Sequence, residues 1–491
     1  MARQIGRKTT LLALIPALVL GGFAAVPSGA QNSAIAPITA KDRAEGAKAH
    51  PQLVAQFGGA MTGPQADYVQ SIGRKIAVAS GGGNAPSAYT VTLLNSSVDN
   101  AFAIPGGYLY TTRQLVALMN NEAELAGVLG HEKGHVDARH SAKRQSAATK
   151  NTIFGVVGAV LSSVLLGNSQ VGQYLQQGFM QGSQLLTLKY SRTQENEADA
   201  LGIQYLKRAG YDPRAMSTVL QSLANQNALD ARLMGTSAQV PEWASTHPDP
   251  AARVRTTLGL AGSGGGVTNR DAFLTRISGL VYGDAPEQGY IEGRSFKHSL
   301  YKIAFDAPTG FYLVNSSQAV TIGGQSGKGQ FTSAAFNGDL DAYVRNVFTE
   351  FGTANKAQLN PSAVQRTTVN GIPAAYSRAR VDSGNGQQVD VTVFAYQIDA
   401  KTAYHFMTIT QAGANTFDPM FGSMRRLSTS EAAALKPRKL VVVTVRRGDT
   451  VQSLAARMAY TDAPLDRFLV LNGLSANSAL TTGQKIKLVT Y

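Results

Sequence analysis

Alternating and helical hydrophobic patterns divide the first part of the chain into short strands and long helices. Residues 88–115 alternate between apolar and polar positions like two strands, interrupted by an Ile-Pro-Gly-Gly turn. Residues 121–144 follow with helical periodicity, and Asn121 and Glu124 have capping-box spacing at their start. A second helical pattern covers residues 190–213. We therefore expect a strand pair followed by two helices.

Two linker-like stretches, 260–269 and 427–439, separate three folded parts of this 491-residue chain. The middle part, residues 267–428, contains strand-like runs at 301–308, 310–315 and 389–398, with helical segments at 339–352 and near its start. We predict a multidomain α+β protein with a helix-rich domain over residues 31–262 and an α+β middle domain. The role of the middle domain does not follow from its sequence.

The N-terminus has the pattern of a secretory signal peptide. Three basic residues precede the apolar run of residues 11–26, and small residues follow up to Ala30. That run is shorter than the roughly 20 residues that a membrane-spanning helix needs. We expect residues 1–30 to be removed on export. The chain has no cysteine, so no disulfide or lipid-bearing cysteine is expected, and the periplasm is favoured.

Charge and hydropathy predict loose contact with anionic surfaces. The formal net charge is +14, which becomes +11 without the three basic residues of the leader. A cationic excess favours anionic lipids and cell-wall polymers, whereas no nucleic-acid-binding signature is present. Residues 151–188 contain no charged residue, and their longest apolar portion is too short to cross a membrane. We expect either a lid helix with peripheral membrane contact or a plain buried helix there.

A zinc-binding pattern lies on the first long helix. His131 and His135 are four residues apart, so their imidazoles project from one helical face. Glu132 lies beside them, where it can take a proton from a water on the metal. The segment has the complete H-E-x-x-H pattern of zinc peptidases, which requires one further protein ligand.

The second long helix offers that further ligand. Glu195 and Asp199 are four residues apart on one face, so Glu195 can complete the site while Asp199 hydrogen-bonds the outer nitrogen of a ligand histidine. Glu197 is rotated about 200° from Glu195 and is the less favoured ligand. His140 is rotated about half a turn from His131 and about 140° from His135, so continued helix predicts that it points elsewhere.

The H-E-x-x-H motif, followed by SRTQENEAD at residues 191–199, resembles the M48 family of zinc metallopeptidases. That family has the same motif and a later E-x-x-x-D, and these positions match one for one. Segments 100–112 and 245–254 also resemble the elements that flank the site in the family. The similarity spans residues 40–262, which is more specific than H-E-x-x-H alone.

The resemblance implies a zincin-type domain with one Zn²⁺ per chain. It also implies that Glu195 is the third ligand and that Asp199 hydrogen-bonds a ligand histidine. It also implies a strand that holds an extended peptide by backbone hydrogen bonds, formed by Asn100, Ala101, Phe102 and Ala103. An ordinary core strand is the alternative.

Two further residues near the end of this similarity are candidates for the site. His247 matches a histidine of exported family members, which implies a catalytic role on the tetrahedral intermediate or a fourth, self-inhibiting zinc ligand. A loop anchor is the alternative for His247. Arg253 is a candidate partner for a site carboxylate, and an exposed arginine is the alternative.

The C-terminal unit, residues 440–491, resembles a LysM module, a small β-α-α-β fold. The resemblance implies binding of N-acetylglucosamine-containing glycans, with possible contacts at Gly448, Asp449, Thr450 and Asn472. Gly448 suits a turn, and Asp449 or Thr450 suits a helix cap. A degenerate module that only packs on the protein is the alternative; a functional one would tether the chain to peptidoglycan.

These features together predict a periplasmic zinc endopeptidase. By analogy with exported relatives, its expected substrates are misfolded or stalled envelope proteins. Two other functions stay open: a non-proteolytic assembly factor or chaperone for envelope proteins, and a hydrolase of peptidoglycan crosslinks.

Overall fold

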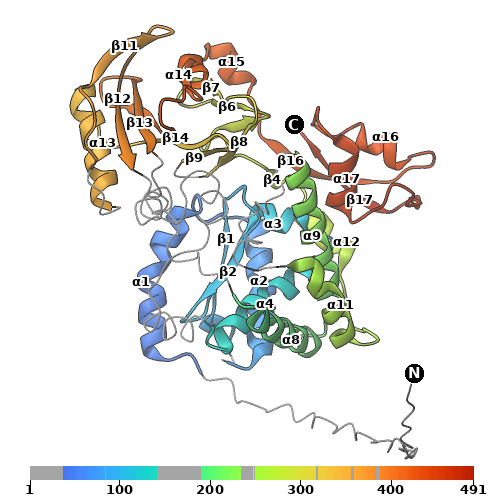
Figure 1. The fold of residues 1–491 in the computed structure, drawn as a ribbon. Coiled ribbons are helices and arrows are strands. Elements are labelled where there is room, and N and C mark those ends of the chain that lie inside the picture. The colour runs from blue at the N-terminus through green and yellow to red at the C-terminus, as the bar shows by residue number, and fades with distance from the viewer. Residues whose placement is uncertain are drawn as a thin grey trace, which may run out of the picture. The chain divides into compact units, whose positions relative to one another are not determined.

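The computed structural model describes most of the chain from residue 37 onward (Figure 1). The described ranges are 37–82, 85–140, 190–233, 247, 249–316, 319–354, 359–382 and 388–491. The expected signal peptide and the uncharged segment 151–188 lie outside them. Within these ranges, every helix is too short or too polar to span a membrane.

The first part of the fold is a helical layer built around α4. This helix, Glu122–Asp137, packs against α2, α8 and α9, and all its residues from Ala123 to His135 are buried. It begins as expected, because the Asn121 side chain accepts a hydrogen bond from the Glu124 amide. The other helices of the layer are α1 (Ala40–Gln56), α2 (Pro64–Ser80), α8 (Arg192–Arg208), α9 (Ala215–Leu233) and α11 (Pro250–Ala261).

A small sheet lies against this layer, and the prediction of two strands for it was wrong. It has three strands in the order β1-β3-β2: β1 (Thr90–Leu94), β2 (Ala101–Ile104) and β3 (Tyr108–Thr112). The first expected strand is divided by residues 95–100, which are polar except for Val98, and the chain then returns as the hairpin β2–β3. Strand β3 then pairs in parallel with β1, and the short helix α3 (Arg113–Leu118) follows.

The middle part is built on a seven-stranded antiparallel sheet in the order β11-β12-β13-β14-β10-β9-β8. Helix α13 (Leu340–Ala354) packs its apolar face on this sheet. Strands of a second, four-stranded sheet share a hydrophobic core with the seven-stranded sheet. This architecture confirms the predicted α+β class. The strands are β8 (Phe311–Asn315), β9 (Val320–Gly324), β10 (Gly327–Ser333), β11 (Gln365–Val369), β12 (Ile372–Asp382), β13 (Gln388–Gln397) and β14 (Ala403–Gln411), with β5 (Tyr290–Glu292), β6 (Ser295–His298), β7 (Ile303–Asp306) and β15 (Arg425–Arg426) in the second sheet.

The C-terminal unit has the predicted β-α-α-β order. Its elements are β16 (Arg438–Thr444), α16 (Val451–Ala455), α17 (Pro464–Asn472) and β17 (Lys485–Thr490). Gly448 has a φ of 92°, and the Thr450 hydroxyl caps α16 by accepting from the Ser453 amide. The Asn472 side chain is buried and hydrogen-bonds the backbone of Phe468 and Lys487. The side chain of Asn472, one of the expected glycan contacts, therefore forms its hydrogen bonds inside the module.

A buried lysine joins this unit to the helical layer. Lys487 of β17 is fully buried, and its Nζ donates to the backbone carbonyls of Ala117, Leu118 and Met119 at 2.9, 2.9 and 2.7 Å. These carbonyls lie at the C-terminal end of α3, where a cation is favoured. Burial lowers the pKa of Lys487 to about 7, and the carboxylate of Glu124 opposes that change. The hydrophobic core is continuous across the junction.

Candidate metal centre

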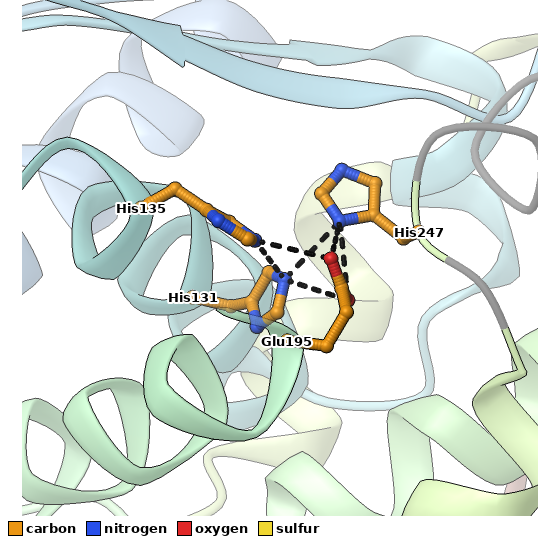
Figure 2. Close-up of side chains that lie close together, drawn as sticks. All are labelled: His131, His135, Glu195 and His247. Carbon is orange, nitrogen blue, oxygen red and sulfur yellow. Dashed lines mark hydrogen bonds and ion pairs between the residues drawn. The ribbon is translucent and has the colours of Figure 1, made fainter. Parts of the chain in front are cut away.

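Three separate elements bring four side chains that could hold a metal ion to one point (Figure 2). Helix α4 supplies His131 and His135 from its last two turns, and α8 supplies Glu195 from its first turn. His247 comes from the segment that precedes α11. One ligand atom of each residue lies within 4.8 Å of the others, and all four side chains are buried.

The donor atoms are close enough to share one ion. His131 Nε2 lies 3.0 Å from His135 Nε2, and the two nitrogens lie 3.6 and 3.4 Å from the nearest Glu195 oxygens. His247 Nδ1 lies 3.1 Å from Glu195 Oε1 and 3.3 Å from His131 Nε2. Imidazole nitrogens with one carboxylate form a donor set that fits tetrahedral Zn²⁺.

The outer nitrogen of His131 is held by Asp199. His131 Nδ1 lies 2.9 Å from Asp199 Oδ1, so the ring donates from Nδ1 and directs the Nε2 lone pair to the centre. Arg253 in turn donates to both Asp199 oxygens, at 2.8 and 2.5 Å, and to Glu195. Arg253 is buried rather than exposed, so it is a partner of two site carboxylates.

Burial and neighbouring charges set the protonation of the centre. Burial raises the pKa of Glu132, against the effect of His247 and His131. Burial also favours a protonated Glu195, but His247 and His135 outweigh it and hold the pKa of Glu195 well below its usual range. Burial lowers the pKa of His135, which keeps this imidazole neutral and able to bind a cation. For His247, the carboxylates of Glu195 and Glu132 outweigh burial and raise the pKa.

Glu132 Oε1 has an ion-pair contact with His247 but no hydrogen-bond partner in the described part of the chain. The Glu132 side chain is buried, and Oε1 has no hydrogen bond to any residue in the described ranges. The nearest charged partner is His247, whose Nε2 lies 3.4 Å away. A buried carboxylate oxygen of this kind needs an outside donor such as water.

The predicted direction of His140 was wrong. Helix α4 ends at Asp137 instead of continuing to residue 144, and Arg139 takes a left-handed φ of 55°. The turn brings His140 back against the site, where it is buried with its Nδ1 2.8 Å from His135 Nδ1. Its Nε2 lies 3.1 Å from Glu197, which does not join the ligand group.

Tyr190 is a site residue that the sequence did not indicate. Its ring stacks on His135, with centroids 3.6 Å apart and an interplanar angle of 23°. The ring also lies 5.2 Å from that of His247. Its position directly before Ser191, the N-cap of α8, is the signal that could have revealed it.

The strand expected to hold a peptide lies at a sheet edge. Strand β2 contacts α4 and, among the described strands, pairs only with β3. Asn100 precedes β2 and is bonded to Thr112, while Ala101, Phe102 and Ala103 lie within the strand. The outer edge of β2 therefore has backbone groups that can pair with an extended chain.

Comparison with known proteins agrees with the predicted resemblance. Residues 64–261 match the family model for Peptidase family M48, and residues 443–489 match the model for the LysM domain. The beta-barrel assembly-enhancing protease of Escherichia coli (strain K12) is 34% identical over 189 residues, and that of Yersinia pestis is 33% identical over 190 residues. Each match covers 38% of this chain and 37% of the relative. The mitochondrial metalloendopeptidase OMA1 of Arabidopsis thaliana is 32% identical over 169 residues, which are 34% of this chain and 30% of the relative.

Proposed function

We propose that this chain is a zinc-dependent endopeptidase, from the premise that residues 64–261 are an M48 peptidase domain. The observation that carries the proposal is the convergence of His131, His135 and Glu195 beside Glu132. Glu132 is buried with a raised pKa, and one of its oxygens has no hydrogen bond within the described part of the chain. These are the position and basicity of a general base.

The protein residues divide the chemistry between them. His131, His135 and Glu195 would hold one Zn²⁺ per chain, which when bound polarises the scissile carbonyl and lowers the pKa of water. Glu132 accepts the proton of the attacking water and delivers it to the leaving amine. Asp199, from behind, keeps the His131 ring oriented during both steps.

We assign His247 two roles at different stages. Between Glu195 and Glu132, its imidazole takes up space next to the general base, and it would supply a fourth donor to the metal, which would keep the site closed at rest. Once withdrawn from that position, a protonated His247 stabilises the oxyanion of the tetrahedral intermediate. His247→Ala therefore opens the resting site and weakens catalysis by each productive complex.

The proposed substrates are misfolded or stalled envelope proteins in the periplasm. An extended segment of the substrate pairs with β2, and this needs a chain that has no stable sheet of its own. The names of the bacterial relatives, beta-barrel assembly-enhancing proteases, support an envelope substrate. The expected signal peptide supports export.

The LysM domain adds a proposed attachment to peptidoglycan. Gly448 and Thr450 are exposed and Asp449 is half-buried, so this turn can contact a glycan. The cationic excess of the chain and its uncharged segment 151–188 add peripheral contact with membrane lipids. Attachment would keep the peptidase near newly exported proteins.

The test is cleavage of casein by purified residues 31–491, beside Glu132→Gln at matched zinc content. We expect the wild type to cleave and the variant to lose about 10²- to 10⁴-fold in kcat, because a general base contributes that much. His247→Ala separates a latent wild type from an inactive one.

Three outcomes would contradict the proposal. Inactivity of both the wild type and His247→Ala with zinc bound would refute the peptidase, and an aggregation assay would then test a chaperone. Equal cleavage by Glu132→Gln would refute the general base. Digestion of purified sacculi without any action on casein would replace the proposal with a peptidoglycan hydrolase.

A further inference from the structure

We infer that His140 and Glu197 form a positioning relay that fixes His135 as a metal ligand. The inference rests on the proposed metal centre and adds two residues outside its ligand set. His135 Nδ1 lies 2.8 Å from His140 Nδ1, and His140 Nε2 lies 3.1 Å from Glu197 Oε2. His140 is fully buried, so this geometry is inside the protein.

The hydrogen bonds can run in only one direction if His135 is to bind a cation. The metal-facing atom, Nε2, must carry a lone pair, so the hydrogen of the neutral ring lies on Nδ1. His135 Nδ1 then donates to His140 Nδ1, which must be an acceptor. The hydrogen of His140 therefore lies on Nε2 and points at the Glu197 carboxylate, which accepts it.

Comparison of the two ligand histidines shows what the relay supplies. The outer nitrogen of His131 meets the buried carboxylate of Asp199 directly, whereas that of His135 reaches a carboxylate only through His140. Glu197 has 49% of its side chain exposed, so His140 joins a buried ligand to an anion at the surface. Both ligands thus have the same tautomer, and the centre contains one buried anion fewer than with two direct carboxylates.

The backbone and its neighbours hold the relay in place. The left-handed Arg139 reverses the chain after α4, and Asp137 anchors the end of that helix by bonds to Lys133 and to the Tyr205 hydroxyl of α8. Tyr190 covers one face of His135. His135 therefore has a neighbour on its face and an acceptor at its outer nitrogen, which together fix its orientation.

The test measures zinc affinity by chelator competition, without any substrate. His140→Phe keeps a ring of similar size but removes the acceptor, and we expect it to weaken zinc binding about 10- to 100-fold. His140→Asn places an amide oxygen near the former Nδ1, and we expect it to restore most of the affinity. Glu197→Gln should have the smaller effect, since Glu197 is half-exposed.

Two controls separate a relay from a merely structural residue. His405→Phe removes another buried histidine, which lies on β14, is bonded to Tyr343 and does not belong to the ligand group, and this change should leave zinc affinity unchanged. Thermal unfolding of the metal-free proteins reports any loss of fold. The absorption spectrum of the Co²⁺-substituted protein should change in His140→Phe and return in His140→Asn.

Zinc affinity within about twofold of wild type in a folded His140→Phe would overturn the inference, because an orienting partner is worth more. Failure of His140→Asn to restore affinity would overturn it as well, since an acceptor alone should suffice. Neither result depends on cleavage, so the inference can fail while the proposed peptidase stands. Likewise, the peptidase proposal can fail while the relay is confirmed by zinc affinity.

Discussion

Helix α4 buries ionisable groups at both ends, and the two ends are completed differently. At its first turn, Glu124 accepts from the Asn120 amide and from the Thr218 hydroxyl, each at 2.7 Å. Lys487, close to Glu124, donates to three carbonyls. The chain itself supplies these partners.

The polar groups of the last two turns of α4 are arranged differently from those of the first turn. The Nε2 atoms of His131 and His135 lie 3.0 Å apart, and each lies within 3.6 Å of a Glu195 oxygen. If both rings donate from Nδ1, as the inferred relay requires for His135, the two Nε2 lone pairs would repel at this distance unless a cation lay between them. Glu132 Oε1 also has no hydrogen bond to a described residue.

Burial of charge is therefore a poor sign of function by itself. An ionisable group that is buried without partners costs several kcal/mol of folding free energy. A stable protein therefore supplies a partner for each buried charge or binds a ligand that does so. The Lys487 end is a structural junction because its partners are present. The histidine end points to a ligand because four buried side chains that could hold a metal ion meet there.

The largest loss of stability should come from Lys487→Met, which changes the first-turn end of α4. The change leaves the three carbonyls at the end of α3 without their donor and removes the charge of Lys487 that acts on Glu124, and we expect a loss of about 3–5 kcal/mol in the free energy of unfolding. Urea unfolding at pH 6 measures it, below the pKa of about 7 that burial gives Lys487. Lys439→Met, at an exposed position on the neighbouring strand β16, is the control. Equal stability of the two variants would show that the junction contributes little.

Zinc removal should have the next largest effect, and only at the other end of α4. With free zinc about 100-fold above its Kd, binding stabilises the fold by about 2.7 kcal/mol, so chelation should lower the free energy of unfolding by that amount. His135→Ala should not respond to zinc. Lys487→Met should keep the full response, because the two ends share no described partner. A lost response in Lys487→Met would show that the ends are coupled.

The smallest effect should come from the helix cap. Asn121→Ala removes the acceptor of the Glu124 amide, and we expect a loss of about 1 kcal/mol in the free energy of unfolding. Zinc affinity should be unchanged, and Asn121→Ser should restore the stability. Weakened zinc binding in Asn121→Ala would mean that the first turn of α4 sets the geometry of the last.

Local patterns were sufficient to predict that His131, His135 and Glu195 come together, but not what surrounds them. His131 and His135 share a face because they are four residues apart on a helix, and Glu195 stands at the matching position of the second helix. His140 could not be predicted in the same way, because the left-handed Arg139 ends the periodicity. A polar sequence around such a turn can also continue a helix.

Long-range contacts explain the other differences. The parallel pairing of β1 with β3 joins segments that no hairpin pattern connects, and the break at residues 95–100 that separates β1 from β2 was not recognised. Lys487 bonds a carbonyl 370 residues away in the chain, and nothing near Lys487 in the sequence indicates burial. The segment predicted as a linker before the LysM domain contains the capped helix α15 (Thr429–Ala434).

The position of β2 at the edge of its sheet, among the described strands, has a consequence for the proposed peptidase. If a substrate adds a strand there, it can do so only while its own strands have no neighbours, and that interval would end when folding or assembly finishes. Cleavage would then compete with maturation as one rate against another. A protein that matures quickly would be spared whatever its sequence, and a delayed one would be degraded in proportion to its delay.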